Sequence, residues 1–178
     1  FGVPEAEALE RAKAMVELVG LPAAVLDQSP FDLSGGQMRR VAIAGVLAMQ
    51  PEVLILDEPT AGLDPVGRRE MMGLFEKLHR EQGMTIVMVT HQMDDVANYA
   101  DHVVVLENGG IAKSGTPREI FADPEWLTSK QLGLPTTTQF AQALIKKGFV
   151  FPQVPLTEHE LAAMLRDQLP QEAGGANE

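Results

Sequence analysis

The chain of 178 residues contains no cysteine and has little positive charge. Without cysteine it cannot form disulfides, thiolate metal sites or a cysteine nucleophile. Lysine and arginine total 14 against 25 aspartates and glutamates, so the formal net charge is −11. Because nucleic acids and anionic lipids attract basic surfaces, this balance predicts that nucleic acid is not a partner.

Long apolar runs are also missing. No run approaches the roughly 18 apolar residues that a membrane-spanning helix needs, and no basic segment followed by an apolar one opens the chain. The sequence therefore predicts a soluble chain, which is compatible with a position on a membrane protein. Since the chain begins at Phe1 rather than at a methionine, we expect further residues upstream.

Three short apolar runs predict strands of a parallel sheet that is buried on both faces, because none of the runs alternates with polar residues. They are residues 53–56, 86–89 and 103–106. Between the first two runs, Asp64 and Pro65 predict the start of a helix and Gly83 its end. This βαβ order predicts an α/β fold, with a turn at residues 108–110 leading into an antiparallel edge strand.

Helices are expected outside this sheet as well. Residues 4–19 repeat apolar side chains at three- and four-residue steps, which is typical of an amphipathic helix. Residues 36–49 form a second expected helix. After Gly115 several prolines separate short helical segments, which we interpret as a helical appendix.

The segment Leu33-Ser34-Gly35-Gly36-Gln37 marks the start of the second helix. Two glycines let an anion approach the backbone, and the first N–H groups of a helix point toward such an anion. An anion-binding site is therefore one hypothesis. The alternative is a capping box alone, which Ser34 and Gln37 suffice to form.

Two further signals lie at predicted strand ends. Asp57 and Glu58 follow the first apolar run, at the edge where ligands of open α/β sheets bind. One carboxylate could hold Mg²⁺ through water while the other faces a nucleophilic water, although both could simply cap the turn at residues 59–60. His91 follows the second run, so we expect it at the same sheet edge as Asp57.

In this order the motifs resemble those of ATP-binding-cassette (ABC) ATPases. The signature, the Walker B motif, the D-loop and the switch histidine correspond to residues 33–37, 54–60, 61–64 and 90–91. The resemblance covers about residues 1–121. Within the family the sequence is most similar to the ATPase subunits of energy-coupling factor (ECF) transporters, in particular to the second of the two. Such transporters import vitamins or transition-metal ions.

The resemblance implies roles for individual residues. Residues 34–37 would contact the γ-phosphate of an ATP that is held by the opposite ATPase subunit, and Asp64 would link the two sites of the dimer. Asp57 would bind Mg²⁺ through water, and Glu58 would polarise or deprotonate the attacking water. His91 would hydrogen-bond the γ-phosphate. ATP and Mg²⁺ are thus the implied cofactors.

The resemblance also implies partners and domains. The partners are a second ATPase subunit, related or identical, a transmembrane coupling subunit and a substrate-binding membrane component, with this chain peripheral on the cytoplasmic side of the cell membrane. Residues 1–33 would end the helical subdomain, residues 34–121 form the ATPase core, and residues 122–178 form a helical dimerisation appendix with a frayed tail. Four apolar residues of the appendix are candidates either for pairing or for a plain core: Phe140, Leu144, Leu161 and Leu165.

One family motif is missing, because no Gly-x-x-x-x-Gly-Lys-Ser/Thr loop occurs in the chain. We therefore expect a C-terminal fragment of an ATPase subunit that is inactive by itself. One alternative is a non-catalytic docking module, although such a module has no chemical need for Asp57, Glu58 and His91. Another is a cassette ATPase with a different task, such as export.

Overall fold

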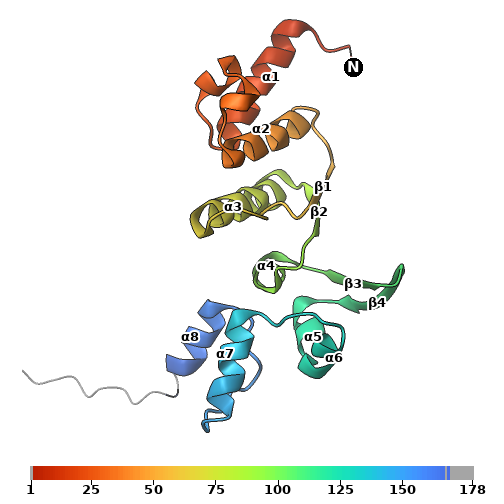
Figure 1. The fold of residues 1–178 in the computed structure, drawn as a ribbon, viewed down its shortest axis with the longest axis vertical. Coiled ribbons are helices and arrows are strands. Elements are labelled where there is room, and N and C mark those ends of the chain that lie inside the picture. The colour runs from red at the N-terminus through yellow and green to blue at the C-terminus, as the bar shows by residue number, and fades with distance from the viewer. Residues whose placement is uncertain (1, 167, 169–178) are drawn as a thin grey trace, which may run out of the picture. The chain divides into compact units, whose positions relative to one another are not determined.

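The computed structural model describes residues 2–166 and residue 168 (Figure 1). They form two compact units that divide after Val89, and each unit is described by itself. The first unit contains α1 (Glu5–Leu18), η1 (Ala23–Asp27), η2 (Pro30–Asp32), α2 (Gly35–Leu47), β1 (Val53–Asp57), α3 (Pro65–Gln82) and β2 (Thr85–Val89). The second contains α4 (Met93–Tyr99), β3 (Val103–Glu107), β4 (Gly110–Gly115), α5 (Pro117–Phe121), α6 (Pro124–Ser129), α7 (Thr136–Ile145) and α8 (Glu158–Arg166).

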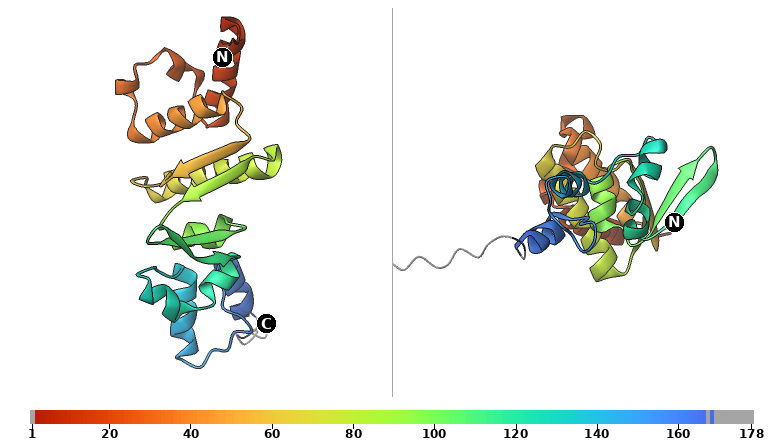
Figure 2. Two further views of the ribbon diagram at one scale, coloured as in Figure 1. Left: turned by 90° about the vertical axis from the view of Figure 1, so that its right-hand side faces the viewer. Right: turned by 90° about the horizontal axis from the view of Figure 1, so that it is seen from below.

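In the first unit β1 and β2 pair in parallel and are joined through α3, as Figures 1 and 2 show. The register aligns Val53 with Thr85 and Asp57 with Val89. The side chain of Asp64 caps α3, and Gly83 ends the helix at φ +67°, a conformation that glycine adopts without steric cost. The predicted βαβ unit and the predicted limits of its helix are confirmed.

The sheet of the first unit is covered on one face only. Leu54 and Leu56 of β1 are buried in a core built with α2 and α3. The residues that point the other way are exposed: Val53 by 50%, Ile55 by 71%, Val87 by 46% and Val89 by 53%. The prediction that both faces are buried is therefore wrong for this chain. An apolar strand pattern indicates a face that avoids water, but the first unit itself supplies helices for only one face of this sheet.

In the second unit β3 and β4 form an antiparallel hairpin, with a register shift between Val105 and Leu106. Asn108 and Gly109 make the turn at φ +50° and +78°, so the predicted hairpin is confirmed. Among the described strands, β3 pairs with β4 alone, whereas the sequence predicted a third strand of the parallel sheet. A tight turn brings β4 directly beside β3, and a local pairing of this kind forms without a long connection.

The helices of the second unit pack around a core of Ile120, Phe121, Leu127 and Leu156. Arg118 of α5 donates to the carbonyl of Val154 at 3.1 Å and to the carboxylate of Glu160 at 2.6 Å, which ties α8 and the segment before it to α5. The compact units divide the chain after Val89, so the three-part division at residues 33 and 121 stays a prediction. The predicted frayed tail at residues 171–178 lies outside the described residues.

The four apolar residues of the appendix differ in burial. Leu161 is buried, which supports a core role, while Phe140 is 54% exposed. Leu144 and Leu165 are half-buried. A role in pairing stays a prediction for the residues that remain accessible.

Candidate functional site

The signature segment forms the start of α2. The Ser34 hydroxyl accepts a hydrogen bond from the Gln37 N–H at 3.3 Å, and the Gln37 side chain accepts one from the Ser34 N–H at 2.9 Å. The capping box is thus confirmed. Ser34 and Gly35 are nevertheless exposed, and a Cβ added to Gly35 would meet no atom within 4 Å. The capped helix start therefore presents open space to a ligand or a second protein, so capping and anion binding do not exclude one another.

The two adjacent carboxylates stand at the end of β1. Asp57 is the last residue of the strand and is exposed, whereas Glu58 is half-buried. Glu58 adopts φ +45°, a left-handed conformation that costs about 1–2 kcal/mol for a residue with a side chain. Two backbone hydrogen bonds hold it there, from its N–H to Val89 at 2.9 Å and from Ala61 to its carbonyl at 3.1 Å. Strain of this kind concentrates at functional sites.

A single arginine connects the signature helix to the loop after Glu58. Arg39 of α2 donates through Nη1 to the carbonyl of Pro59 at 3.0 Å and to that of Ala61 at 2.5 Å. The same loop ends at Asp64, whose carboxylate accepts the Gly67 N–H at 2.7 Å. Arg39 thus ties α2, the helix that begins at the signature residues, to the loop between Glu58 and Asp64, while a common site for these residues stays a prediction. A role for Arg39 was not predicted, because nothing in its spacing along the sequence shows which carbonyls its side chain reaches.

His91 lies just after β2, in the second unit, and is exposed. Its Nε2 lies 3.2 Å from the side-chain Nε2 of Gln92. The backbone N–H of Gln92 donates to the Thr90 hydroxyl at 3.0 Å. Val89, two residues before His91, pairs with Asp57 across β1 and β2. Because His91 and Asp57 belong to different units, their predicted place at one sheet edge stays a prediction.

The donor set at the end of β1 fits a magnesium ion that keeps most of its water. Among the described residues no group of three or more His, Cys, Asp or Glu side chains could hold a metal ion alone. Mg²⁺ usually binds one or two carboxylates and completes its shell with waters and substrate phosphates. The exposed carboxylate of Asp57 meets that requirement, and binding through water needs no second protein ligand.

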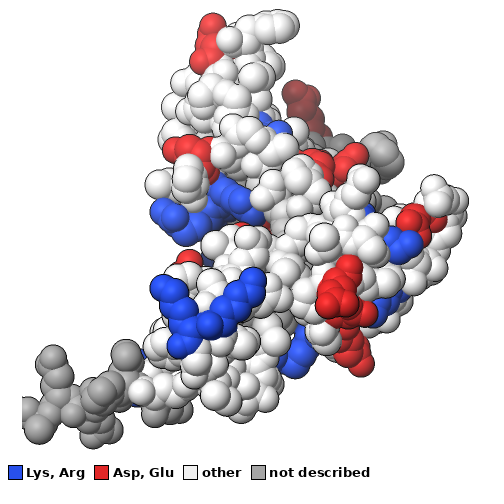
Figure 3. Space-filling model, turned by 60° about the horizontal axis from the view of Figure 1, so that its bottom comes forward, with Lys and Arg blue, Asp and Glu red and all other residues white. Residues whose placement is uncertain are grey.

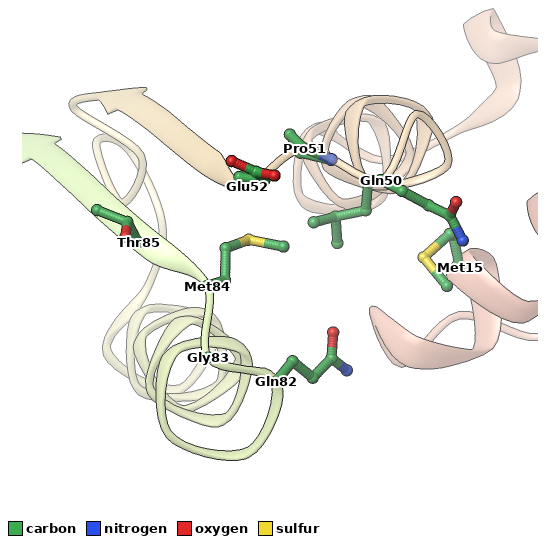
Figure 4. Close-up of a pocket in the computed structure, with 9 residues that line it drawn as sticks. Met15, Gln50, Pro51, Glu52, Gln82, Gly83, Met84 and Thr85 are labelled. Carbon is green, nitrogen blue, oxygen red and sulfur yellow. The ribbon is translucent and has the colours of Figure 1, made fainter.

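A separate hollow of about 550 Å³ lies in the first unit, at the opposite end of the strands (Figure 4). Its lining includes Glu52, Thr85, Gln50, Met84 and Met15. Since Glu52 and Thr85 stand at the N-terminal ends of β1 and β2, the hollow is not part of the carboxylate site.

On the surface shown in Figure 3, acidic and basic side chains lie in separate small groups between larger uncharged areas.

Comparison with known proteins gives consistent matches. The profile of a family described as ABC transporter matches residues 4–61. The chain is 97% identical over all 178 residues to the energy-coupling factor transporter ATP-binding protein EcfA2 of Latilactobacillus sakei, and covers 61% of that protein. It is 69% identical over 175 residues to the protein of the same name from Lacticaseibacillus paracasei, covering 59% of it. The chain thus spans about three fifths of the length of these relatives.

A solved structure agrees with these sequence matches. It is cbiO1 of Clostridium perfringens, described as part of the ABC transporter complex cbiONQ. The two are 40% identical in sequence and match with a TM-score of 0.64. The match covers 82% of this chain and 56% of the cbiO1 chain.

The chain is therefore similar to ABC transporter ATPases, as its four motifs predicted. Over its whole length it is similar to the ATP-binding subunits named EcfA2, so the predicted resemblance to the second ATPase subunit of ECF transporters is also confirmed. The α/β fold class is confirmed by the same structural match and by the parallel pair of β1 and β2.

Proposed function

We propose that this chain provides the signature helix and the catalytic carboxylate of an ATPase subunit that drives an ECF importer. The subunit would hydrolyse ATP to power uptake of vitamins or transition-metal ions across the cell membrane. The observation that carries the proposal is the pair of adjacent carboxylates at the end of β1, with Glu58 held at a positive φ by hydrogen bonds on both sides. The names of the similar proteins support the transport task.

The chemistry follows from how the two carboxylates are presented. Glu58, half-buried at the start of a fixed turn, is the residue we assign to polarise or deprotonate the attacking water. Asp57 would hold Mg²⁺ through a water molecule, and the bound ion would neutralise charge on the phosphates. His91 would hydrogen-bond the γ-phosphate and keep the water in line.

The exposed start of α2 supports a site shared between two subunits. Ser34, Gly35, Gly36 and Gln37 would contact the γ-phosphate of ATP held by a second ATPase subunit, and Asp64 would link the two sites. The membrane-embedded coupling subunit and the substrate-binding component would be the other partners, with this chain on the cytoplasmic side of the membrane. Among the described residues, no helix is long and apolar enough to cross a membrane.

The test uses a composite subunit, in which this chain replaces the matching part of EcfA2 from Latilactobacillus sakei, produced together with the other subunits of that transporter. Glu58→Gln removes the basic carboxylate and keeps the size of the side chain. We expect ATP hydrolysis to fall by about 10²–10⁴-fold, with ATP binding retained.

Glu52→Gln is the matched control, because it makes the same change at the exposed opposite end of β1. It should leave hydrolysis unchanged. Steady-state hydrolysis by Glu58→Gln at the rate of the unmodified composite would overturn the assignment.

A further inference from the structure

The start of α4, the helix that follows His91, is bonded to the start of α7. Asp94 is the second residue of α4, and Thr136 is the first residue of α7. One oxygen of the Asp94 carboxylate accepts the backbone N–H of Thr136 at 2.7 Å, and the other accepts the Thr136 hydroxyl at 2.9 Å. Two hydrogen bonds therefore join helices whose contacting residues are 42 positions apart in the chain.

This contact caps α7 from outside. The residue before α7 is Pro135, which makes no side-chain hydrogen bond to the helix start. A carboxylate at a helix N-terminus satisfies a free N–H group and interacts favourably with the helix dipole. Asp94 performs this task although it belongs to a different helix, so α7 depends on α4 for its N-terminal cap.

The segment that bears His91 is continuous with the capped contact. The N–H groups of Asp95 and Val96 donate to the carbonyl of Gln92, the neighbour of His91, at 3.0 and 3.2 Å. A Cβ at Gly133 would lie 3.8 Å from Cγ of Met93, so the chain leading into α7 passes close to the first turn of α4. A displacement of α7 would therefore be transmitted to the turn that presents His91.

We propose that Asp94 is a positioning residue for ATP hydrolysis. Its hydrogen bonds to Thr136 let helix α7 hold the start of α4 in place, and the start of α4 in turn sets the position of His91. The inference rests on the proposed function, in which His91 contacts the γ-phosphate. Neither Asp94 nor Thr136 belongs to the residues assigned to nucleotide, so the effect falls on turnover rather than on ATP affinity.

The experiment measures kcat and KM for ATP in the composite subunit with its partner subunits. Asp94→Ala removes both hydrogen bonds, and we expect kcat to fall roughly tenfold with KM unchanged, since small misplacements of a catalytic group reduce turnover strongly. Thr136→Val removes only the hydroxyl bond and should cost roughly threefold. The double variant should be no slower than Asp94→Ala, because the two residues act through one contact.

Asp94→Asn is the rescue variant. Its amide oxygen still accepts the Thr136 N–H, and its NH₂ group can donate to the Thr136 hydroxyl, so most of the turnover should return. The matched control is Asp123→Ala, which removes the cap of α6 in the same unit, a bond of 3.0 Å to the Trp126 N–H. This control should lower the unfolding midpoint to a similar extent and leave kcat unchanged.

Two outcomes would overturn the inference. One is an unchanged kcat in Asp94→Ala, and the other is an equal loss of kcat in Asp94→Ala and Asp123→Ala, which would show a merely structural role. His91→Ala separates this failure from that of the proposed function. If His91→Ala retains full turnover, the role of His91 itself is wrong. If His91→Ala is inactive while Asp94→Ala is unaffected, only the role of Asp94 is rejected.

Discussion

Arg39 donates a hydrogen bond of 2.5 Å to the carbonyl of Ala61, 22 residues further along the chain. The same nitrogen donates to the carbonyl of Pro59 at 3.0 Å. A positively charged side chain of the signature helix thus fixes the loop between the proposed catalytic carboxylate and Asp64. No side chain of the loop is needed for this contact, because both acceptors are backbone carbonyls.

We expect Arg39→Met to release this loop. Hydrogen bonds from a charged donor contribute about 1.5–3 kcal/mol, and Arg39 is half-buried, so the free energy of unfolding should fall by about 1–3 kcal/mol. Chemical denaturation of the composite subunit measures the loss. Arg69→Met, the same change on the exposed side of α3, is the control and should cost under about 0.5 kcal/mol. Equal stabilities of the two variants would contradict the prediction.

Two capping boxes found among the described residues allow capping to be separated from catalysis. Ser34 caps α2, and Thr116 caps α5 with Glu119 as its partner. Replacing either residue by alanine should cost about 1 kcal/mol of stability, because each removes one side-chain acceptor from a helix start. Only Ser34→Ala should also lower ATP hydrolysis by the composite subunit. If Thr116→Ala lowers hydrolysis equally, Ser34 has no role beyond its cap.

The strained backbone at Glu58 predicts that, of two variants lacking the carboxylate, the one with glycine at this position is the more stable. Glu58→Gly relieves the cost of φ +45°, whereas Glu58→Ala deletes the same carboxylate and keeps the strain. The glycine variant should be more stable than the alanine variant by on the order of 1 kcal/mol, with hydrolysis lost in both. Thermal unfolding of the two variants tests this. A less stable glycine variant would show that the backbone at this position is unstrained.

The exposed face of β1 predicts poor solubility of the 178-residue chain when it is produced alone. Ile55 is 71% exposed, so Ile55→Thr should increase the soluble fraction at little cost in stability. Leu54 is only 3% exposed, and Leu54→Thr should destabilise the chain by about 2–4 kcal/mol. Sedimentation after expression and denaturation of the soluble protein measure both effects. If Ile55→Thr destabilises the isolated chain as much as Leu54→Thr, the face is not open to water.

The carboxylate of Glu119 predicts a pH dependence. Backbone and side-chain hydrogen bonds from Thr116 lower the pKa of Glu119 below its usual value of 4.5. A lowered pKa in the folded state means that the ionised form stabilises the protein above pH 4.5, and that this contribution is lost as the pH falls through the folded value. The difference in the free energy of unfolding between the unmodified chain and Glu119→Gln should therefore shrink as the pH falls below 4.5 and through the lowered pKa of the folded state. A difference that stays constant down to acid unfolding would show that the pKa is not lowered.

Local features of this protein follow from the sequence alone. The capping box at Ser34, the limits of α3 between Asp64 and Gly83, and the hairpin turn at residues 108–110 all depend on residues a few positions apart. The adjacent carboxylates at the end of β1 were predicted for the same reason, since an apolar run followed by Asp57 and Glu58 identifies a strand end without knowledge of the rest of the fold.

The tertiary structure alone decided which residues come into contact when they are far apart in the chain. An apolar run shows that a strand avoids water but does not say what covers it, so Leu54 is buried while Ile55 is left exposed. The spacing of polar residues likewise gave no indication that Asp94 caps the helix of Thr136. Such contacts exist only where the folded backbone brings a donor within about 3 Å of an acceptor, and that distance is set by the packing of whole helices.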